Sequence, residues 1–211
     1  MTLDPRPLLS ERCRGLIVAI DVQHLYRPNH PRDRGTVFRL ADGTTVTEAA
    51  LATQYAQAAA EYLTARGALV LVNQPAIGEL VGFYSARNRF ARVHGAHAYL
   101  ACHVNAGRGS YAALEHLDGV TVAARLASWI GSALSGFPSI LNARNLALRH
   151  GERGAVCIEA CGPAMAALVV EPFFGDNPKQ QQLTSAAQLV AVGQVIGQGV
   201  ASWWGAGHGS P

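Results

Sequence analysis

Near its amino terminus the chain reads LIVAID at residues 16–21, and His24 follows three residues later. The run is apolar and rich in β-branched residues until it ends at Asp21, which is typical of a strand buried inside a parallel or mixed sheet. In open α/β sheets the ligand site lies beyond the carboxyl ends of the strands. A histidine just past such a strand is therefore a candidate site residue.

Two further apolar runs end in the same way. Residues 98–102 read AYLAC and are followed by His103, and residues 167–170 read ALVV and are followed by Glu171. Because the carboxyl ends of parallel strands meet at one edge of a sheet, we expect these side chains and His24 to gather there. Two histidines and a glutamate at one edge indicate a catalytic metal site.

The remaining sequence alternates between helix and strand patterns. Apolar residues at helical spacing predict helices over about 46–66, 79–93, 120–134, 139–149 and 185–203, the last with Thr184 as its N-cap. Residues 68–72 predict another strand, and a short hairpin is expected around Ala41-Asp42-Gly43 within the long polar loop 26–45. This alternation predicts an α/β protein: a three-layer α/β/α domain with a mostly parallel, mixed central sheet.

Length and composition suit a single domain. The 211 residues are 49% hydrophobic and 15% charged, without an internal repeat or a linker to a second domain. We expect one catalytic domain over 1–211, with a core at about 15–204 and short flexible tails. The formal charge is only +3 and no block of lysine or arginine occurs, which argues against a nucleic-acid partner.

Membrane and export signals are also missing from the sequence pattern. The apolar run before Asp21 is too short to span a bilayer, so no membrane partner is expected. The first fifteen residues are charged and contain prolines instead of the apolar segment of a secretion signal. We therefore expect a protein that is either leaderless or in its mature form.

The four cysteines are Cys13, Cys102, Cys157 and Cys161, and none forms a CxxC pair. Small buried thiols are the expected role, because free cysteine is usually buried. Cys157 and Cys161 are four residues apart, and a local disulfide between them stays open at this stage.

Each candidate residue also has an ordinary structural explanation. His24 and His103 fit a core or hydrogen-bonded edge position, and Glu171 fits a strand end that faces solvent. Glu48 fits a capping box with Thr45, in which the glutamate reaches back to the start of the helix. The functional alternative is that Glu48 completes a His, Glu, His metal shell and that Glu171, between apolar neighbours, transfers protons.

Four segments together resemble the zinc-dependent N-acetylmuramoyl-L-alanine amidases of the Amidase_3 class. IDVQHL at 20–25 resembles their first Ile-Asp-Pro-Gly-His-Gly-like motif, and TEAAL at 47–51 resembles the start of their first long helix. ACHVNA at 101–106 resembles Ser-Ile-His-Ala-Asn-Ala, and VVEPFF at 169–174 resembles Leu-Val-Glu-Leu-Gly-Phe. The resemblance covers about residues 15–204.

This resemblance implies a peptidoglycan hydrolase. It would cleave the amide between N-acetylmuramic acid and L-alanine of the stem peptide. His24, Glu48 and His103 would bind Zn²⁺, and Glu171 would act as general base and then general acid. Asp21 and Asn105 would orient these residues without binding the metal themselves, with Asp21 orienting His24 or the first turn.

The sequence also departs from the family pattern, and other functions stay open. Val22, Gln23 and Leu25 replace a glycine-rich turn around the first histidine, and Asn73-Gln74 replaces Thr-Arg. The alternatives are a zinc peptidase with another peptide substrate, a non-catalytic cell-wall binding protein, and an unrelated α/β domain. The expected place of action is the cell wall, reached either by a phage endolysin that stays cytoplasmic until lysis or by a secreted bacterial enzyme in mature form.

Overall fold

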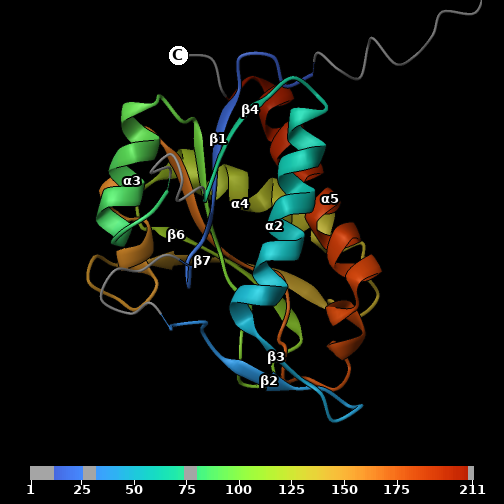
Figure 1. Cartoon of the computed structure of the whole chain (residues 1–211). Coiled ribbons are helices and arrows are strands. Elements are labelled where there is room, and N and C mark those ends of the chain that lie inside the picture. The colour runs from blue at the N-terminus through green and yellow to red at the C-terminus, as the bar shows by residue number, and fades with distance from the viewer. Residues whose placement is uncertain (1–11, 26–31, 74–79, 209–211) are drawn as a thin grey trace, which may run out of the picture.

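The computed structural model describes residues 12–25, 32–73 and 80–208 (Figure 1). Their centre is a six-stranded sheet with the strand order β4-β1-β5-β8-β6-β7. The first four of these strands are parallel, β6 is antiparallel to β8, and β7 is parallel to β6. The predicted mostly parallel, mixed sheet is therefore confirmed.

The sheet strands are β1 (Ile17–Val22), β4 (Leu69–Val72), β5 (Ala98–Cys102), β6 (Tyr111–Leu117), β7 (Asn142–Leu148) and β8 (Ala166–Glu171). A separate antiparallel pair, β2 (Val37–Arg39) with β3 (Thr45–Thr47), forms the hairpin expected around Ala41-Asp42-Gly43. The part of the polar loop at 26–31 lies outside the described residues, as do the tail residues 1–11.

The helices are α2 (Glu48–Thr64), α3 (Tyr84–Val93), α4 (Thr121–Leu134) and α5 (Ala186–Trp203). Short turns of 3-10 helix follow β7 as η2 (Ala155–Cys157) and η3 (Glu159–Cys161), and precede α5 as η4 (Gln181–Thr184). A π-helical turn, η5 (Trp204–His208), follows α5. Helices α2, α4 and α5 cover one face of the sheet, and α3 with η2 and η3 covers the other (Figure 1). This is the predicted three-layer arrangement.

Alternation along the strands divides the core between the two faces. On β1, for example, Ile20 packs with the α2, α4 and α5 layer, whereas its neighbour Ala19 packs with the α3 layer. Both faces of the central strands are buried, which explains why their sequences are continuous apolar runs instead of alternating patterns. The polar residues His103 and Glu171 therefore come only at the carboxyl ends of β5 and β8.

The predicted helix at 139–149 is wrong. Residues Asn142–Leu148 form β7 and pair in parallel with β6, from Tyr111↔Asn142 to Leu117↔Leu148. Alanine, leucine and arginine give this segment a helical propensity, but propensity is a weak preference that tertiary pairing overrides. β6 was not expected either, because its sequence YAALEHL contains two alanines and lacks a clear alternating pattern.

The other helices are close to their predicted bounds. The N-cap of α5 is Ser185, not Thr184, and its side chain makes no capping hydrogen bond. Helix α3 begins at Tyr84, so the predicted start at about 79 was too early: residues 80–83 are turn, bend and irregular backbone, and position 79 itself is outside the described residues. Helix α2 begins at Glu48 and not at residue 46, because Val46 pairs with Phe38 in the hairpin.

Candidate metal and catalytic site

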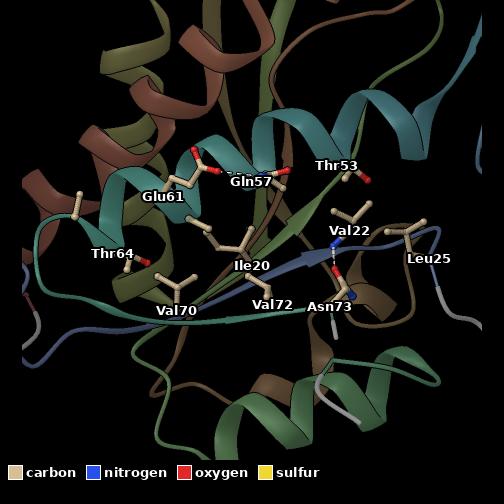
Figure 2. A pocket seen from close by; sticks show the side chains of 13 residues that line it. Ile20, Val22, Leu25, Thr53, Gln57, Glu61, Thr64, Val70, Val72 and Asn73 are labelled. Carbon is tan, nitrogen blue, oxygen red and sulfur yellow. Dashed lines mark hydrogen bonds between the residues drawn. The ribbon is translucent and has the colours of Figure 1, made fainter. Parts of the chain in front are cut away.

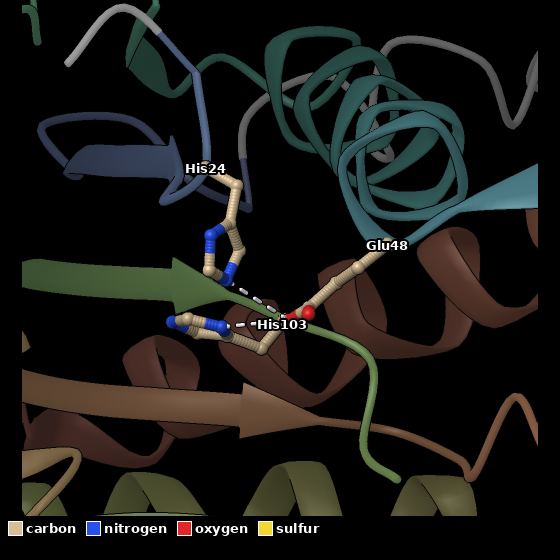
Figure 3. A group of neighbouring side chains, drawn as sticks. All are labelled: His24, Glu48 and His103. Atoms are coloured by element: carbon tan, nitrogen blue, oxygen red, sulfur yellow. Dashed lines mark hydrogen bonds and ion pairs between the residues drawn. The ribbon is translucent and has the colours of Figure 1, made fainter. Parts of the chain in front are cut away.

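His24, Glu48 and His103 come together at the carboxyl edge of the sheet (Figure 3). His24 follows β1, His103 follows β5, and Glu48 is the first residue of α2. One ligand atom from each lies within 4.8 Å of the others. The three residues therefore form a set of two imidazoles and one carboxylate that could hold a metal ion.

The Glu48 carboxylate is the centre of this cluster. Its Oε1 lies 2.9 Å from His103 Nδ1 and 3.3 Å from His24 Nε2, and it accepts a 3.2 Å hydrogen bond from the Val104 amide. Its Oε2 accepts a 3.0 Å hydrogen bond from the amide of Thr36. The two rings meet edge to face, with centroids 5.1 Å apart. Both histidines thus direct a nitrogen at the same carboxylate.

The capping interpretation of Glu48 is wrong. The N-cap of α2 is Thr47, whose hydroxyl accepts a hydrogen bond from the Ala50 amide. The Glu48 side chain turns away from its own helix end toward the loops that follow β1 and β5. Its 5% exposure shows a carboxylate held inside the site and not at the surface.

Gly35 allows this close packing. Its φ of +69° is in the left-handed region, and a Cβ atom at this position would lie 2.5 Å from Glu48 Oε2 and 2.8 Å from His24 Cδ2. The loop before the hairpin therefore presses directly on two of the three candidate ligands, and only glycine fits there.

The charges in the cluster are coupled. Burial raises the pKa of Glu48, but hydrogen bonds with His103 and His24 outweigh burial and hold the pKa well below its usual range. Burial lowers the pKa of His24, and contacts with Glu48 and Asp33 more than offset this effect. The carboxylate is therefore ionised and available as a ligand over the physiological pH range.

Asp33 is a site residue that the sequence patterns missed. Its Oδ1 lies 3.1 Å from His24 Nδ1, on the opposite side of the ring from Glu48. It also accepts a hydrogen bond from the Gly35 amide. A carboxylate on the second nitrogen of a histidine fixes the orientation and tautomer of the ring. Only its place in the long polar loop, among several other polar residues, could have pointed to it.

Asp21 supports the turn before His24. Among the described residues, the partners of the Asp21 carboxylate do not include His24 itself. Its Oδ1 accepts hydrogen bonds from Arg87 Nη1 at 2.8 Å and Asn73 Nδ2 at 2.7 Å, and Oδ2 accepts from Tyr99 and Gln23. Arg87 also donates to the carbonyls of residues 22, 23 and 25. The buried pair Asp21–Arg87 thus determines the path of the turn that carries His24.

Glu171 lies beside the cluster on the next strand. Strands β5 and β8 pair through Cys102↔Val170, so His103 and Glu171 are one residue beyond paired positions on neighbouring strands. Asn105 continues this edge, because it forms a parallel bridge with Phe174 and its side-chain amide donates to Glu171 Oε2. Asn105 thus orients the carboxylate that the sequence pattern singles out for proton transfer.

The environment of Glu171 favours its protonated form. Burial raises the pKa of this carboxyl to about 8, and the carboxylates of Glu115 and Glu48 add to the effect. Arg153 and the hydrogen bond from Asn105 act in the opposite direction. A carboxyl with a pKa near neutrality can both accept and donate a proton in one reaction cycle.

This shift predicts a pH-dependent stability. Between pH 4.5 and about 8 the folded, metal-free protein holds a proton on Glu171 that the unfolded chain releases, so stability from this group falls as the pH rises. We expect Glu171→Gln to be more stable than the wild type by about 1–3 kcal/mol at pH 8. The difference should shrink toward pH 5. Urea unfolding with a chelator at both pH values measures it, and equal differences at the two values would contradict the shift.

A cavity of about 650 Å³ contains the three candidate ligands and Glu171. Its remaining walls include Tyr84 at the start of α3 and Glu115 on β6, with Arg153, Val156 and Cys157 from the segment after β7. The Cys157 thiol lies 3.9 Å from His103 Nε2. Sequence patterns did not find Glu115 or the wall residues after β7, since the strands β6 and β7 that position them were not predicted.

A second cavity of about 690 Å³ lies elsewhere, between α2 and the β1–β4 edge of the sheet (Figure 2). Its walls are mostly aliphatic, with Ile20 and Val22 on β1 beside Val70 and Val72 on β4, and Glu61 is the acidic side chain among its described walls. The candidate ligands and Glu171 are not part of it. The described walls of this second cavity therefore do not offer an alternative metal site to the His24, Glu48 and His103 cluster.

The four cysteines are buried and free, which leaves no disulfide between Cys157 and Cys161. Burial raises the pKa of Cys102 and Cys161 well above the usual thiol range, so both are inert at neutral pH. Within the described ranges, the helices are too short or too polar to cross a membrane.

No protein-family model matches the sequence, and no curated protein matches it. Solved structures do match. Cwp6 from Clostridium difficile has a TM-score of 0.72 and 18% sequence identity, over 89% of this chain and 29% of that chain. N-acetylmuramoyl-L-alanine amidase AmiC2 of Nostoc punctiforme has a TM-score of 0.69 and 16% identity, over 90% of this chain and 98% of that chain.

The catalytic domain of CD27L endolysin, which targets Clostridia Difficile, matches with a TM-score of 0.53 and 16% identity, over 89% of this chain and 98% of that chain. At these identities the matches show a shared fold. The chain spans less than a third of Cwp6 but nearly the whole length of the other two chains. The fold implied by the sequence motifs, that of N-acetylmuramoyl-L-alanine amidases, is therefore confirmed.

Proposed function

We propose that this protein is a zinc-dependent N-acetylmuramoyl-L-alanine amidase that cleaves the bond between N-acetylmuramic acid and the L-alanine of the stem peptide. The main support is the convergence of His24, Glu48, His103 and Glu171 in one cavity of an amidase fold. The sequence motifs around these residues resemble the corresponding family segments. Together, the fold, the ligand set and the neighbouring carboxyl favour hydrolysis over binding alone.

The donor set fits zinc. Two imidazoles and one carboxylate are a known catalytic zinc set that leaves one position open for water or substrate. In this chain His24 Nε2, His103 Nδ1 and the Glu48 carboxylate converge. When bound, Zn²⁺ supplies a Lewis acid that polarises the scissile carbonyl and lowers the pKa of the attacking water. Asp33 would hold the ring of His24 in place for this role.

Glu171 would carry the proton. It would accept the proton of the attacking water and deliver it to the nitrogen of the departing peptide, so that one carboxyl acts first as base and then as acid. Its raised pKa suits both steps, and Asn105 keeps the carboxylate directed at the cavity.

We also propose that the chain acts as one catalytic domain with its core at about 15–204 and that its place of action is the cell wall. The matched amidase and endolysin catalytic domain have nearly the same extent. A phage lysis enzyme and a secreted bacterial enzyme would use the same site chemistry. The two origins are distinguished by measuring lysis of cells that express the protein with and without phage lysis genes. A phage enzyme should lyse the cells only when those genes are present.

The function is tested on purified cell walls. The zinc-loaded protein should lower the turbidity of a wall suspension and release peptides with a new N-terminal alanine, leaving free lactyl groups on the glycan. A peptidase of the same fold would open peptide bonds and leave the lactyl amide intact. A wall-binding protein would sediment with the walls and release no amine. Either of these results would reject the amidase proposal.

Metal binding gives a separate prediction. Replacing His103 with alanine removes one of three ligands, and we expect zinc affinity to fall by more than about 100-fold. Competition with a chromogenic chelator measures the affinity. His150→Ala is the matched control, because the side chain of His150 is 77% exposed and is not part of the cavity. Equal zinc affinities of the two variants would exclude the proposed ligand set.

A further inference from the structure

Glu115 is an unusual residue for its place in the fold. It lies in the middle of β6, which is an inner strand between β8 and β7, and it is largely shielded from solvent. Among the described residues, no hydrogen bond or ion pair reaches its carboxylate. A half-buried carboxylate that makes no hydrogen bond or ion pair loses part of its hydration without compensation, which lowers the stability of a protein. Such a residue is a candidate for binding a ligand.

The strand order gives Glu115 a defined position relative to the reaction. Strands β5, β8 and β6 are consecutive in the sheet and carry His103, Glu171 and Glu115. In the β6–β8 pair, Glu171 is opposite Ala113 and Val169 is opposite Glu115, so both glutamates point to the same face. All three residues line one cavity. Glu171 therefore lies between the metal cluster and Glu115.

The chain beyond β7 closes over Glu115. Gly154 has a φ of +96°, and a Cβ atom there would lie 2.6 Å from Glu115 Oε2. The nearby charged groups are Arg153, Glu152 and Glu171. Burial raises the pKa of Glu115, Glu152 acts in the same direction, and Arg153 lowers it. The exposed Arg153 makes no ion pair with Glu115 in the described structure, so a cation from outside the chain can occupy this place.

We propose that Glu115 binds the amino group of the peptide that the reaction releases, an inference that rests on the proposed function. In that reaction the oxygen of water bonds to the carbonyl carbon and the carbon–nitrogen bond breaks. Glu171 passes the proton of the water to the departing nitrogen, which must therefore lie within its reach. The metal cluster lies on one side of Glu171 and Glu115 lies on the other, so a released amine on that side would meet the Glu115 carboxylate.

The chemistry of the product fits this acceptor. A free α-amino group has a pKa of about 7.7–8.0, so near neutrality most of the released amine takes a further proton from solvent. An ammonium ion forms strong charge-assisted hydrogen bonds with a carboxylate. Binding it would also give Glu115 a cation in direct contact, because Arg153 acts on it without forming an ion pair.

The test compares two peptides and two proteins. Calorimetry measures binding of the dipeptide L-Ala-D-Glu and of its N-acetylated form to the zinc-loaded wild type and to Glu115→Gln. We expect the wild type to prefer the free amine by about tenfold or more. In Glu115→Gln this preference should fall to about twofold or less, with binding of the acetylated peptide unchanged. An unchanged preference in the variant, or no binding of either peptide, would overturn the proposal.

Two measurements separate ligand binding from a structural role. Thermal unfolding of Glu115→Gln should show equal or higher stability, because an unpaired, half-buried charge is removed, whereas a structural role predicts a loss. Glu152→Gln is the matched control, since it removes the same charge from an exposed neighbour and should keep the amine preference. The calorimetry measures binding without turnover, so its result is independent of the hydrolysis assay. If wall hydrolysis failed, the proposed function would be rejected, and the amine preference would still be decided by the binding data.

Discussion

Replacing Glu171 with glutamine is expected to lower the turnover rate on cell walls by about 10²–10⁴-fold, the usual contribution of a general acid–base residue. Glutamine keeps the size of the side chain and can still contact Asn105, but it cannot accept and return a proton. The zinc content should not change, because the three candidate ligands are His24, Glu48 and His103. Turbidity loss and release of N-terminal alanine measure the rate.

Two comparisons make this result specific. Glu61→Gln alters an exposed glutamate of α2 outside the catalytic cavity and should retain full activity. The Glu171→Gln protein should also be more stable than the wild type at pH 8, so its loss of activity cannot be assigned to unfolding. Full activity of Glu171→Gln would reject the proposed proton carrier, and loss of zinc would show that Glu171 supports the metal site instead.

The candidate site was accessible from sequence because its residues terminate recognisable strands. An apolar run buried on both faces can end only where the backbone leaves the core, and in a parallel sheet those ends share one edge. This argument places His24, His103 and Glu171 without any contact information. Glu48 follows from the start of a long helix, where the sequence pattern alone favours capping, and the structure shows that Thr47 is the N-cap.

The residues on the other side of the cavity could not be predicted from the sequence in this way. Strands β6 and β7 pair with each other, and an edge strand such as β7 is not apolar enough to stand out in the sequence. Glu115 and Arg153 reach the cavity only through this pairing and the turn that follows it. Asp33 depends on a loop path that no periodic pattern specifies. Long-range contacts therefore determine the residues that local patterns miss.

Replacing Arg87 with methionine is expected to lower the free energy of unfolding by about 3–5 kcal/mol. Arg87 and Asp21 are both 0% exposed and joined by a 2.8 Å ion pair. Methionine fills much of the arginine volume but leaves the Asp21 charge without its cationic partner inside the core. The variant also loses the hydrogen bonds to the carbonyls of residues 22, 23 and 25, so zinc affinity should fall through displacement of His24.

Urea unfolding of the metal-free protein measures the stability, and a matched control lies on the same helix. Arg89→Met replaces an exposed arginine of α3 and should change stability by no more than about 0.5 kcal/mol. Because removing both partners of a buried pair costs less than removing one, Asp21→Asn combined with Arg87→Met should be less destabilised than the sum of the two single variants. If Arg87→Met behaves like Arg89→Met, the buried pair does not hold the turn, and the position of His24 must depend on Asp33 and Gly35 instead.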